Sequence, residues 1–216
     1  MAFFLLTRVL PVSHIGVTGQ YHKGDDKSER IPPRERILAA AGELFYREGI
    51  RAVGIEAIAE AASTNKMTLY RHFASKDELV AEYLRERARL ADAAWDRLAA
   101  AYPGDALAQL RAWIAKMAER LANADERGCA LVNAAVELPE KSHPARRVIE
   151  EFKTAERSRL TQVCRATGLR DPDVLADELH LMLEGARVTA QSVGRDGLSE
   201  RVMRMSEALI SAHTKP

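Results

Sequence analysis

Residues 65–76 have the sequence Asn-Lys-Met-Thr-Leu-Tyr-Arg-His-Phe-Ala-Ser-Lys, and this stretch decides how the rest of the chain is interpreted. Asn65 is a favourable N-cap, because its side-chain oxygen can accept a hydrogen bond from a free amide of the first helical turn. Leu69 and Phe73 lie four residues apart and form one apolar stripe. Residues 64–76 include no acidic residue. These features predict a short helix with one apolar side and one side rich in hydrogen-bond donors.

The donor-rich side of this helix suits an anionic groove, and we interpret the helix as a DNA recognition helix. Arginine or lysine paired with guanine is the commonest base contact, so Arg71 and Lys66 are the candidates for reading bases. Two alternatives stay open at this point. Tyr70 could be a core aromatic with its hydroxyl at the rim, and His72 could be a helix-end residue without a special role.

Composition excludes little by itself. The chain has 216 residues, with 32 basic and 31 acidic side chains, and residues 31–80 hold seven of each. A nucleic-acid partner would therefore be recognised by a local cluster and not by bulk charge. Cys129 and Cys164 give no disulfide framework and fit a reducing cytoplasm. No apolar run approaches the ~20 residues of a membrane span, so no membrane partner is expected.

Apolar residues recur at spacings of three and four in every long segment, which predicts an all-α fold. The expected helices are bounded by glycine, proline and capping residues. They cover approximately residues 33–49, 55–62, 65–73, 75–102, 105–122, 128–138, 144–167, 172–193 and 198–213. Residues 1–30 are expected to form a disordered extension. A helix-turn-helix domain is expected over residues 31–80, and a larger helical domain over residues 81–216.

Five segments carry a resemblance to TetR-type bacterial transcriptional repressors. They are Arg36-Ile37-Leu38 through Phe45, Gly49-Ile50, Ile58-Ala59, Thr-Leu-Tyr-Arg-His-Phe at 68–73 and Ser-Lys-Asp-Glu-Leu at 75–79. The resemblance covers about residues 33–84 and implies a three-helix DNA-binding domain followed by a helical domain that binds a ligand and dimerises. It implies a homodimeric repressor of a palindromic, double-stranded DNA operator, released by a small-molecule inducer.

The resemblance also implies roles for single residues in the recognition stretch. The positions where the family reads bases are Lys66, Met67, Thr68, Arg71 and His72, and those where it grips phosphate are Tyr70 and Lys76. Leu69 and Phe73 match core positions of the family.

The chain departs from the family pattern in the preceding helix and turn. Gly54 and Ile55 stand where the family often has a pair of threonine or serine residues, so a cap and a phosphate contact are missing. Ser63 replaces a common turn glycine. Glu56 occupies a place where some members present a basic residue that reads bases. Its carboxylate could accept from a cytosine amino group, but a solvated surface role is the simpler interpretation.

In the family, the last two long helices of each subunit pack into a four-helix dimer interface. The residues that fit this interface are Leu179, Met182, Leu183, Ala186, Ala190, Val202, Met205 and Leu209. The alternative is that these residues form the core of a single chain.

The second domain is expected to hold an apolar pocket for a hydrophobic or aromatic inducer. Candidate lining residues are large or polar side chains on otherwise apolar helix faces, namely Trp95, Trp113, Cys129, Asn133, Glu137, Phe152, His180 and Glu184. We expect no cofactor and no metal, because a His180/Glu184 pair lacks a third ligand in the sequence. The alternative hypotheses are a small helical enzyme using that pair and a redox-sensing regulator using Cys129.

Overall fold

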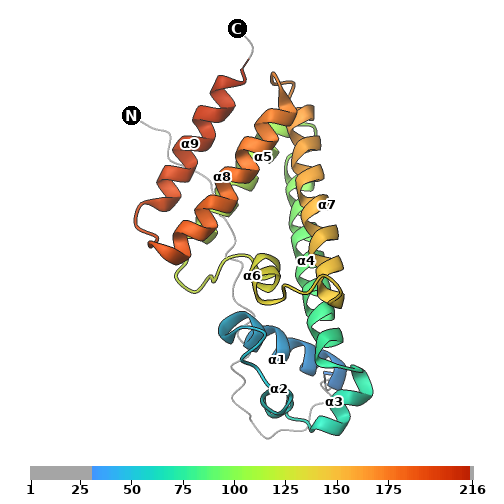
Figure 1. Cartoon of the computed structure of the whole chain (residues 1–216). Coiled ribbons are helices and arrows are strands. Elements are labelled where there is room, and N and C mark those ends of the chain that lie inside the picture. The colour runs from blue at the N-terminus through green and yellow to red at the C-terminus, as the bar shows by residue number, and fades with distance from the viewer. Residues whose placement is uncertain (1–30, 215–216) are drawn as a thin grey trace, which may run out of the picture. The chain divides into compact units, whose positions relative to one another are not determined.

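The computed structural model describes residues 31–214 of the chain, and this part consists of helices and loops without a strand (Figure 1). The predicted extension at residues 1–30 lies outside the described residues. The helices are α1 (Pro33–Glu48), α2 (Ile55–Ala61), α3 (Lys66–His72), α4 (Lys76–Ala101), α5 (Ala106–Ala122), α6 (Ala130–Glu137), α7 (Pro144–Ala166), α8 (Pro172–Ser192) and α9 (Leu198–Ala212). The all-α prediction is confirmed for this part of the chain.

Capping residues set the helix boundaries around the recognition stretch. The side chain of Asn65 accepts a hydrogen bond of 2.9 Å from the amide of Thr68 and starts α3. The hydroxyl oxygen of Ser75 accepts one of 3.1 Å from the amide of Glu78 and starts α4. The carboxylate of Glu78 returns to accept from the amide of Ala74 at 2.7 Å. This arrangement resembles a capping box, except that Glu78 accepts from the residue before the N-cap, and it fixes the break between the two helices.

Helix α4 links the two ends of the described structure. It has 26 residues, which corresponds to about 39 Å at 1.5 Å per residue. In Figure 1 it runs from the three short N-terminal helices up to the level of α5, with α7 beside it. Its N-terminal half buries Leu79, Val80, Tyr83 and Leu84, and its C-terminal half buries Trp95. The same helix therefore belongs to two apolar clusters.

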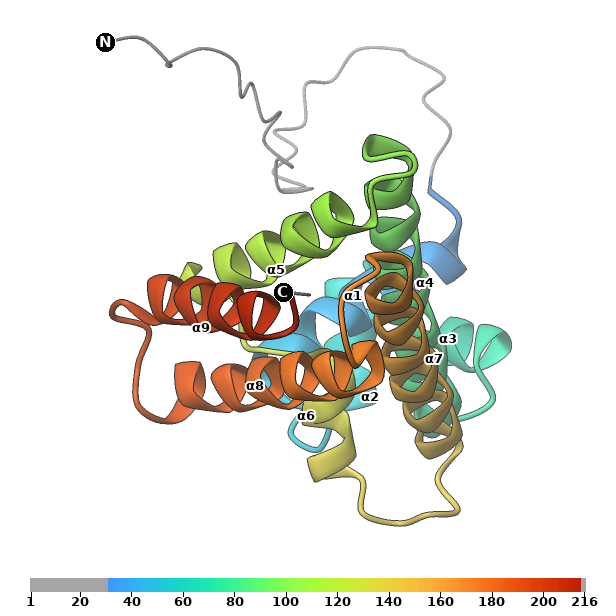
Figure 2. The ribbon, with the colours of Figure 1, turned by 90° about the horizontal axis from the view of Figure 1, so that it is seen from above.

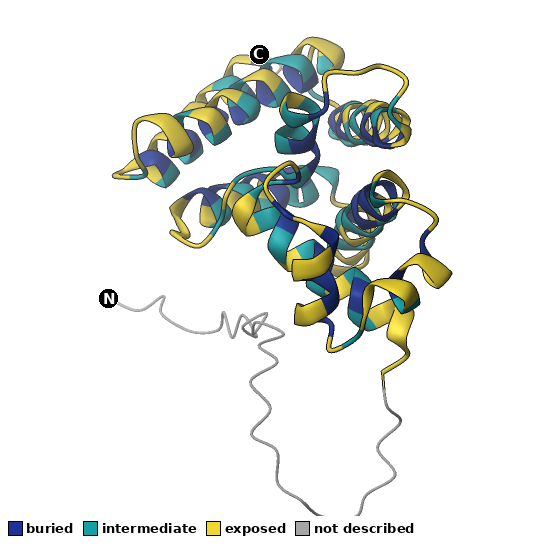
Figure 3. Cartoon of the chain, turned by 60° about the horizontal axis from the view of Figure 1, so that its bottom comes forward, coloured by how far each residue is buried: buried dark blue, intermediate teal, exposed yellow. Residues whose placement is uncertain are grey.

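The first apolar cluster joins the N-terminal helices to helices from later in the chain. It contains buried residues of α1, α2 and α3 together with Leu131 and Ala134 of α6 and Val148 and Ile149 of α7. Figure 3 shows these short helices with buried inner sides and exposed outer sides. Since α6 and α7 complete this core, residues 31–80 do not bury their apolar faces alone. The domain boundary between residues 80 and 81 stays a prediction.

The second apolar cluster lies among α5, α8, α9 and the C-terminal halves of α4 and α7. Figure 2 shows α5, α8 and α9 grouped on one side of α7. Helix α8 packs against both α7 and α9, and α5 packs against α9 and α7. None of the helices described is long and apolar enough to cross a membrane.

Substitutions on opposite sides of α3 should separate its structural face from its exposed face. Leu69 is fully buried, and Leu69→Ala should lower the free energy of unfolding by about 2–5 kcal/mol because it leaves a cavity. Met67 is 69% exposed on the same helix, and Met67→Ala should change it by less than about 0.5 kcal/mol. Urea denaturation followed by circular dichroism measures both values. Equal effects of the two substitutions would show that α3 is oriented differently.

Candidate functional site

Helix α3 packs one side against the core and exposes polar side chains on the other. Leu69 and Phe73 are almost fully buried against α1, α2 and α4, and they fix the rotation of the helix about its axis. The opposite side exposes Lys66, Met67, Tyr70, Arg71 and His72, whereas Thr68 and Lys76 are half-buried. The alternative placement of Tyr70 in the core is therefore wrong. All seven predicted DNA-contacting residues retain surface that a duplex can reach.

The turn between α2 and α3 carries the departures expected from the sequence. Ser63 has a φ of 50°, in the left-handed region where glycine is favoured. This conformation explains why a glycine suits that place. At the start of α2, Gly54 makes no side-chain cap, and Ile55 is buried. In the fold, Gly54 therefore provides no side-chain cap and Ile55 provides no polar group for a phosphate, as the sequence predicts.

One ion pair crosses the exposed surface of α2 and α3. The ammonium of Lys66 lies 2.7 Å from a carboxylate oxygen of Glu56. This hydrogen bond lowers the pKa of Glu56 and raises that of Lys66. Arg71 contacts the Met67 sulfur at 3.8 Å and has no carboxylate partner among the residues that the structure describes. Arg71 is thus available to an anion, while Lys66 would have to leave Glu56.

A cavity of about 120 Å³ lies inside the C-terminal part of the described structure. Trp95 and Trp113 stack in its wall, with ring centroids 5.0 Å apart and planes 19° from parallel. Cys129 and Phe152 also line it. Four of the eight predicted pocket residues are therefore brought together around one space. The sequence interpretation did not include the arginines of the wall, because charged side chains are usually assigned to the surface.

Asn133 and Glu137 do not line this cavity, which corrects their assignment as pocket residues. Asn133 donates a hydrogen bond of 2.7 Å from its amide to the carbonyl of Arg127. Glu137 accepts one of 3.0 Å from the amide of Arg51, and its carboxylate approaches Gly49. Glu137 thus connects α6 to the end of α1 and to the loop that follows it. Asn133 connects α6 to the loop that precedes it.

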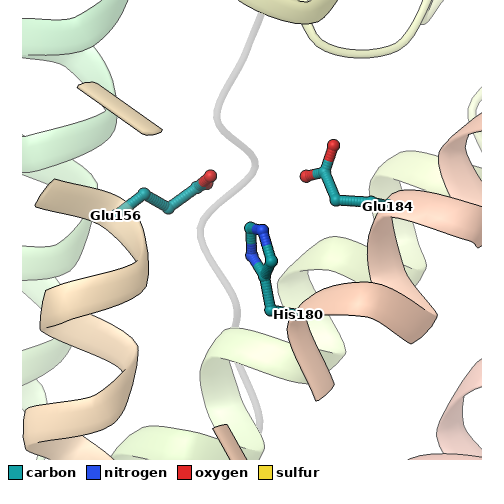
Figure 4. A group of neighbouring side chains, drawn as sticks. All are labelled: Glu156, His180 and Glu184. Atoms are coloured by element: carbon teal, nitrogen blue, oxygen red, sulfur yellow. The ribbon is translucent and has the colours of Figure 1, made fainter. Parts of the chain in front are cut away.

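His180 and Glu184 also lie outside the cavity lining, and the structure brings Glu156 of α7 next to them (Figure 4). One ligand atom of each lies within 4.8 Å of the others. The ammonium of Lys153 is 2.6 Å from Glu156 and 2.9 Å from Glu184, and Arg187 pairs with both carboxylates.

Two cations therefore balance the two carboxylates of this cluster. Burial, followed by the charge of Lys153, lowers the pKa of His180 and so favours its neutral form. A divalent ion would have to displace both Lys153 and Arg187. The cluster is best described as a charge-balanced link between α7 and α8, which the sequence suggested only through the His180/Glu184 spacing.

Most residues predicted for the dimer interface are buried inside the single chain. Those fully or nearly fully buried are Leu179, Leu183, Ala186, Ala190 and Val202, while Met182 and Leu209 are half-buried and Met205 is 50% exposed. The periodic pattern selected the stripe of α8 that packs against its own chain, so the assignment is corrected for the buried residues, and that of Met205 stays a prediction. A second stripe of α8, Val174, Leu181 and Val188, is exposed.

Known proteins resemble this chain in both sequence and fold. The sequence model of the family described as "Bacterial regulatory proteins, tetR family" matches residues 37–83. A crystal structure of a proposed tetR transcriptional regulator (sav143) from Streptomyces avermitilis is 31% identical, with a TM-score of 0.71 over 85% of this chain and 98% of that chain. The chain belongs to the TetR family. It is a DNA-binding transcriptional regulator of the helix-turn-helix type and not an enzyme.

Curated TetR-family relatives match this chain over a short stretch. The transcriptional activator FasR of Mycolicibacterium smegmatis is 42% identical over 59 residues, which is 26% of this chain and 27% of FasR. The transcriptional repressor KstR2 of Rhodococcus jostii is 41% identical over 61 residues, which is 28% of this chain and 30% of KstR2. The chain thus spans under a third of the length of either relative. One activates and the other represses, so this similarity does not set the sign of regulation.

Glu56→Gln distinguishes a surface role of Glu56 from base reading. The substitution removes a negative charge beside the recognition helix and frees Lys66, so affinity for every duplex should rise alike, by less than about tenfold. Fluorescence anisotropy with labelled duplexes of several sequences measures this change. Glu43→Gln on α1 makes the same change in net charge without touching α3 and serves as the control. A loss confined to one operator position would instead assign Glu56 to a cytosine.

Proposed function

We propose that this TetR-family chain is a ligand-responsive repressor that binds a palindromic operator as a homodimer. The observation that carries the proposal is the outward face of α3, which is free of acidic side chains and is fixed from below by Leu69 and Phe73. Two recognition helices on one face of a duplex would lie ~34–36 Å apart. The chain would act in the cytoplasm, where its operator and a reducing environment are found.

Exposed apolar residues on α8 and α9 support a dimer that differs in its details from the one inferred from the sequence. Val174, Leu181 and Val188 follow each other at intervals of seven residues, which forms a seam typical of helix packing. Gly185 lies exposed between Leu181 and Val188, and a side chain there would meet no atom of this chain. Met205 adds an exposed apolar side chain on α9. We propose these two surfaces as the dimer interface.

The cavity supports a small hydrophobic or aromatic inducer, because stacked tryptophans and a phenylalanine line it. Helix α4 contributes Trp95 to the cavity wall and Leu79 to the core beneath α3. A ligand that displaces α4 would therefore reach the recognition helix. It shifts the equilibrium between DNA-binding and released states only by its difference in affinity for the two.

Selection of bound genomic fragments tests DNA recognition directly, and variants then assign roles. Arg71→Ala should reduce discrimination at one position of each half-site by about 1–3 kcal/mol. Lys76→Ala should weaken binding to all sequences alike and reduce the slope of log affinity against log salt by about one. Anisotropy titrations at several salt concentrations measure both effects. Failure of the unaltered protein to bind any duplex at low ionic strength would refute the proposal.

Leu181→Glu tests the proposed dimer interface. Across a two-fold axis the substitution brings like charges together, which costs several kcal/mol, so the dimer dissociation constant should rise about 100-fold or more. Sedimentation velocity over a concentration series measures it. Val136→Glu places the same charge on an exposed valine of α6 and should leave the dimer intact. A monomer–dimer equilibrium that Leu181→Glu does not change would contradict this interface.

A further inference from the structure

One end of the cavity holds more positive than negative charge. Arg87, Arg120 and Arg195 line it there together with a single carboxylate, that of Glu126. Arg120 forms a two-pronged pair with Glu126, at 3.2 and 3.0 Å. Among the described residues, no carboxylate lies within ion-pair distance of Arg87 or Arg195. Three guanidinium groups thus share one carboxylate in a half-buried place, which favours the entry of a second anion.

The two unpaired arginines are held in place by other contacts. Arg87 lies over the ring of Tyr46, with its guanidinium carbon 5.7 Å from the ring centroid. Arg195 donates to the backbone carbonyls of Leu121, at 2.8 Å, and Glu126. Because these contacts are to an aromatic face and to neutral carbonyls, they leave the positive charges uncompensated. These contacts hold the two guanidinium groups beside the cavity, where they can bind an anion.

A second group of charged residues in the cavity wall has no such excess. Glu156 and Arg187 line the cavity and belong to the network in which Lys153 and Arg187 balance Glu156 and Glu184. Figure 4 shows the two carboxylates and His180 of this network. An anion placed here would meet two carboxylates that already have their partners. The charge distribution therefore favours a negative group of a ligand beside Arg87 and not beside Glu156.

The apolar middle of the cavity limits the size and shape of the rest of the ligand. Its volume of about 120 Å³ is close to the ~150 Å³ of an engineered cavity that binds benzene, and well below the range of drug-sized pockets. The stacked Trp95 and Trp113 provide flat faces, and Phe152 and Met117 provide further apolar contacts. One aromatic ring fills this space.

We propose that the cavity binds a monocyclic aromatic carboxylate, with its ring beside Trp95 and Trp113 and its carboxylate among Arg87, Arg120 and Arg195. The proposal rests on the ligand-responsive function proposed above and names the chemical class of the ligand. A neutral aromatic would fill the same volume but leave the excess positive charge without a counter-ion.

The same arginines connect the cavity to the DNA-binding helices through Tyr46 of α1. The Tyr46 hydroxyl donates to Glu126 at 2.9 Å and accepts from the amide of Arg127 at 2.7 Å. Burial, with the Glu126 charge second, raises the pKa of Tyr46 to about 12, so the hydroxyl stays a donor. The pair with Arg120 lowers the pKa of Glu126 in spite of burial, so the acceptor stays charged. This contact joins residues 80 positions apart in the sequence.

A ligand carboxylate would compete with Glu126 for Arg120. Glu126 belongs to the loop between α5 and α6, which can move more easily than a helix. When Glu126 moves away with this loop, the Tyr46 hydroxyl loses its charged acceptor and keeps the carbonyl of Gly128, at 3.1 Å, and the amide of Arg127 as partners. The tie between the end of α1 and the cavity wall is then weaker. Occupancy of the cavity is thereby linked to the position of the helices that carry α3.

Intrinsic fluorescence tests the ligand class without DNA, because both tryptophans of the chain line the cavity. Titration of the full chain with benzoate should give a saturable change. Benzamide, its neutral isostere, should bind at least about tenfold more weakly, which equals ~1.4 kcal/mol, and hexanoate should also bind more weakly. Calorimetry measures the same affinities independently. Absence of saturable benzoate binding in both measurements, or equal binding of benzamide or hexanoate, would overturn the proposal.

Two variants test the residues of the site. Arg87→Gln should abolish the preference for benzoate over benzamide, whereas Arg97→Gln, an exposed arginine of α4 outside the cavity, should retain it. Tyr46→Phe keeps the ring under Arg87 and removes the hydroxyl. In this variant benzoate should still bind, but the ratio of DNA affinities with and without benzoate should approach one. A ratio equal to that of the unaltered protein would overturn the Tyr46 link.

The two proposals fail in different ways. If the ligand-free protein binds no duplex, the repressor function is wrong, while the fluorescence titration still decides the ligand class. If the protein binds an operator but benzoate does not enter the cavity, the repressor function stands and the aromatic carboxylate is excluded.

Discussion

Burial of Leu69 and Phe73 is the constraint on which the DNA-facing surface depends. Their spacing of four residues places both on one side of a helix of seven residues. With that side fixed against α1, α2 and α4, the remaining polar side chains have no direction open except outward. A helix this short is not stable alone, so its orientation comes from packing and from the Asn65 cap. Recognition chemistry on one face is thus a consequence of apolar burial on the other.

The core beneath the recognition helix is not confined to the N-terminal residues. Leu131 and Ala134 of α6, with Val148 and Ile149 of α7, complete it, and α4 continues from it to the cavity. Cores are close-packed, so a displacement at one wall is transmitted and not absorbed. The contacts of Glu137 with Arg51 and of Tyr46 with Glu126 add polar ties along the same border. The cavity and the exposed face of α3 therefore share a continuous packed structure.

The sequence predicted the helices and the rotation of α3 well, because both depend on local signals such as caps, glycines and apolar spacing. It failed on α8, where two apolar stripes repeat with helical periodicity. The stripe containing Leu179 and Leu183 is buried, and the one containing Leu181 and Val188 is exposed. Periodicity identifies both stripes but does not tell which one meets the chain's own core. Only the positions of α7 and α9 decide between them.

Long-range polar contacts were also beyond the reach of the sequence. Asn133 and Glu137 share a face of α6, as predicted, but Glu137 meets the loop after α1 and Asn133 meets the loop before α6. The partner of Glu126 is Tyr46, which no local pattern connects to it. Trp95, Trp113 and Phe152 were found because large aromatic residues gather in cores and pockets alike.

The distribution of charge explains how a chain with a net charge of +1 can present two surfaces that favour anions. More than half of the arginines and lysines between residues 31 and 214 have a carboxylate partner, as Lys153 and Arg187 do. Those without such partners carry the unbalanced charge, and they include Arg71 on α3 and Arg87 at the cavity. Opposite charges elsewhere cancel at distances beyond about 10 Å in physiological salt. Under the two proposals above, anion binding depends on which cations are left without carboxylate partners and not on their number.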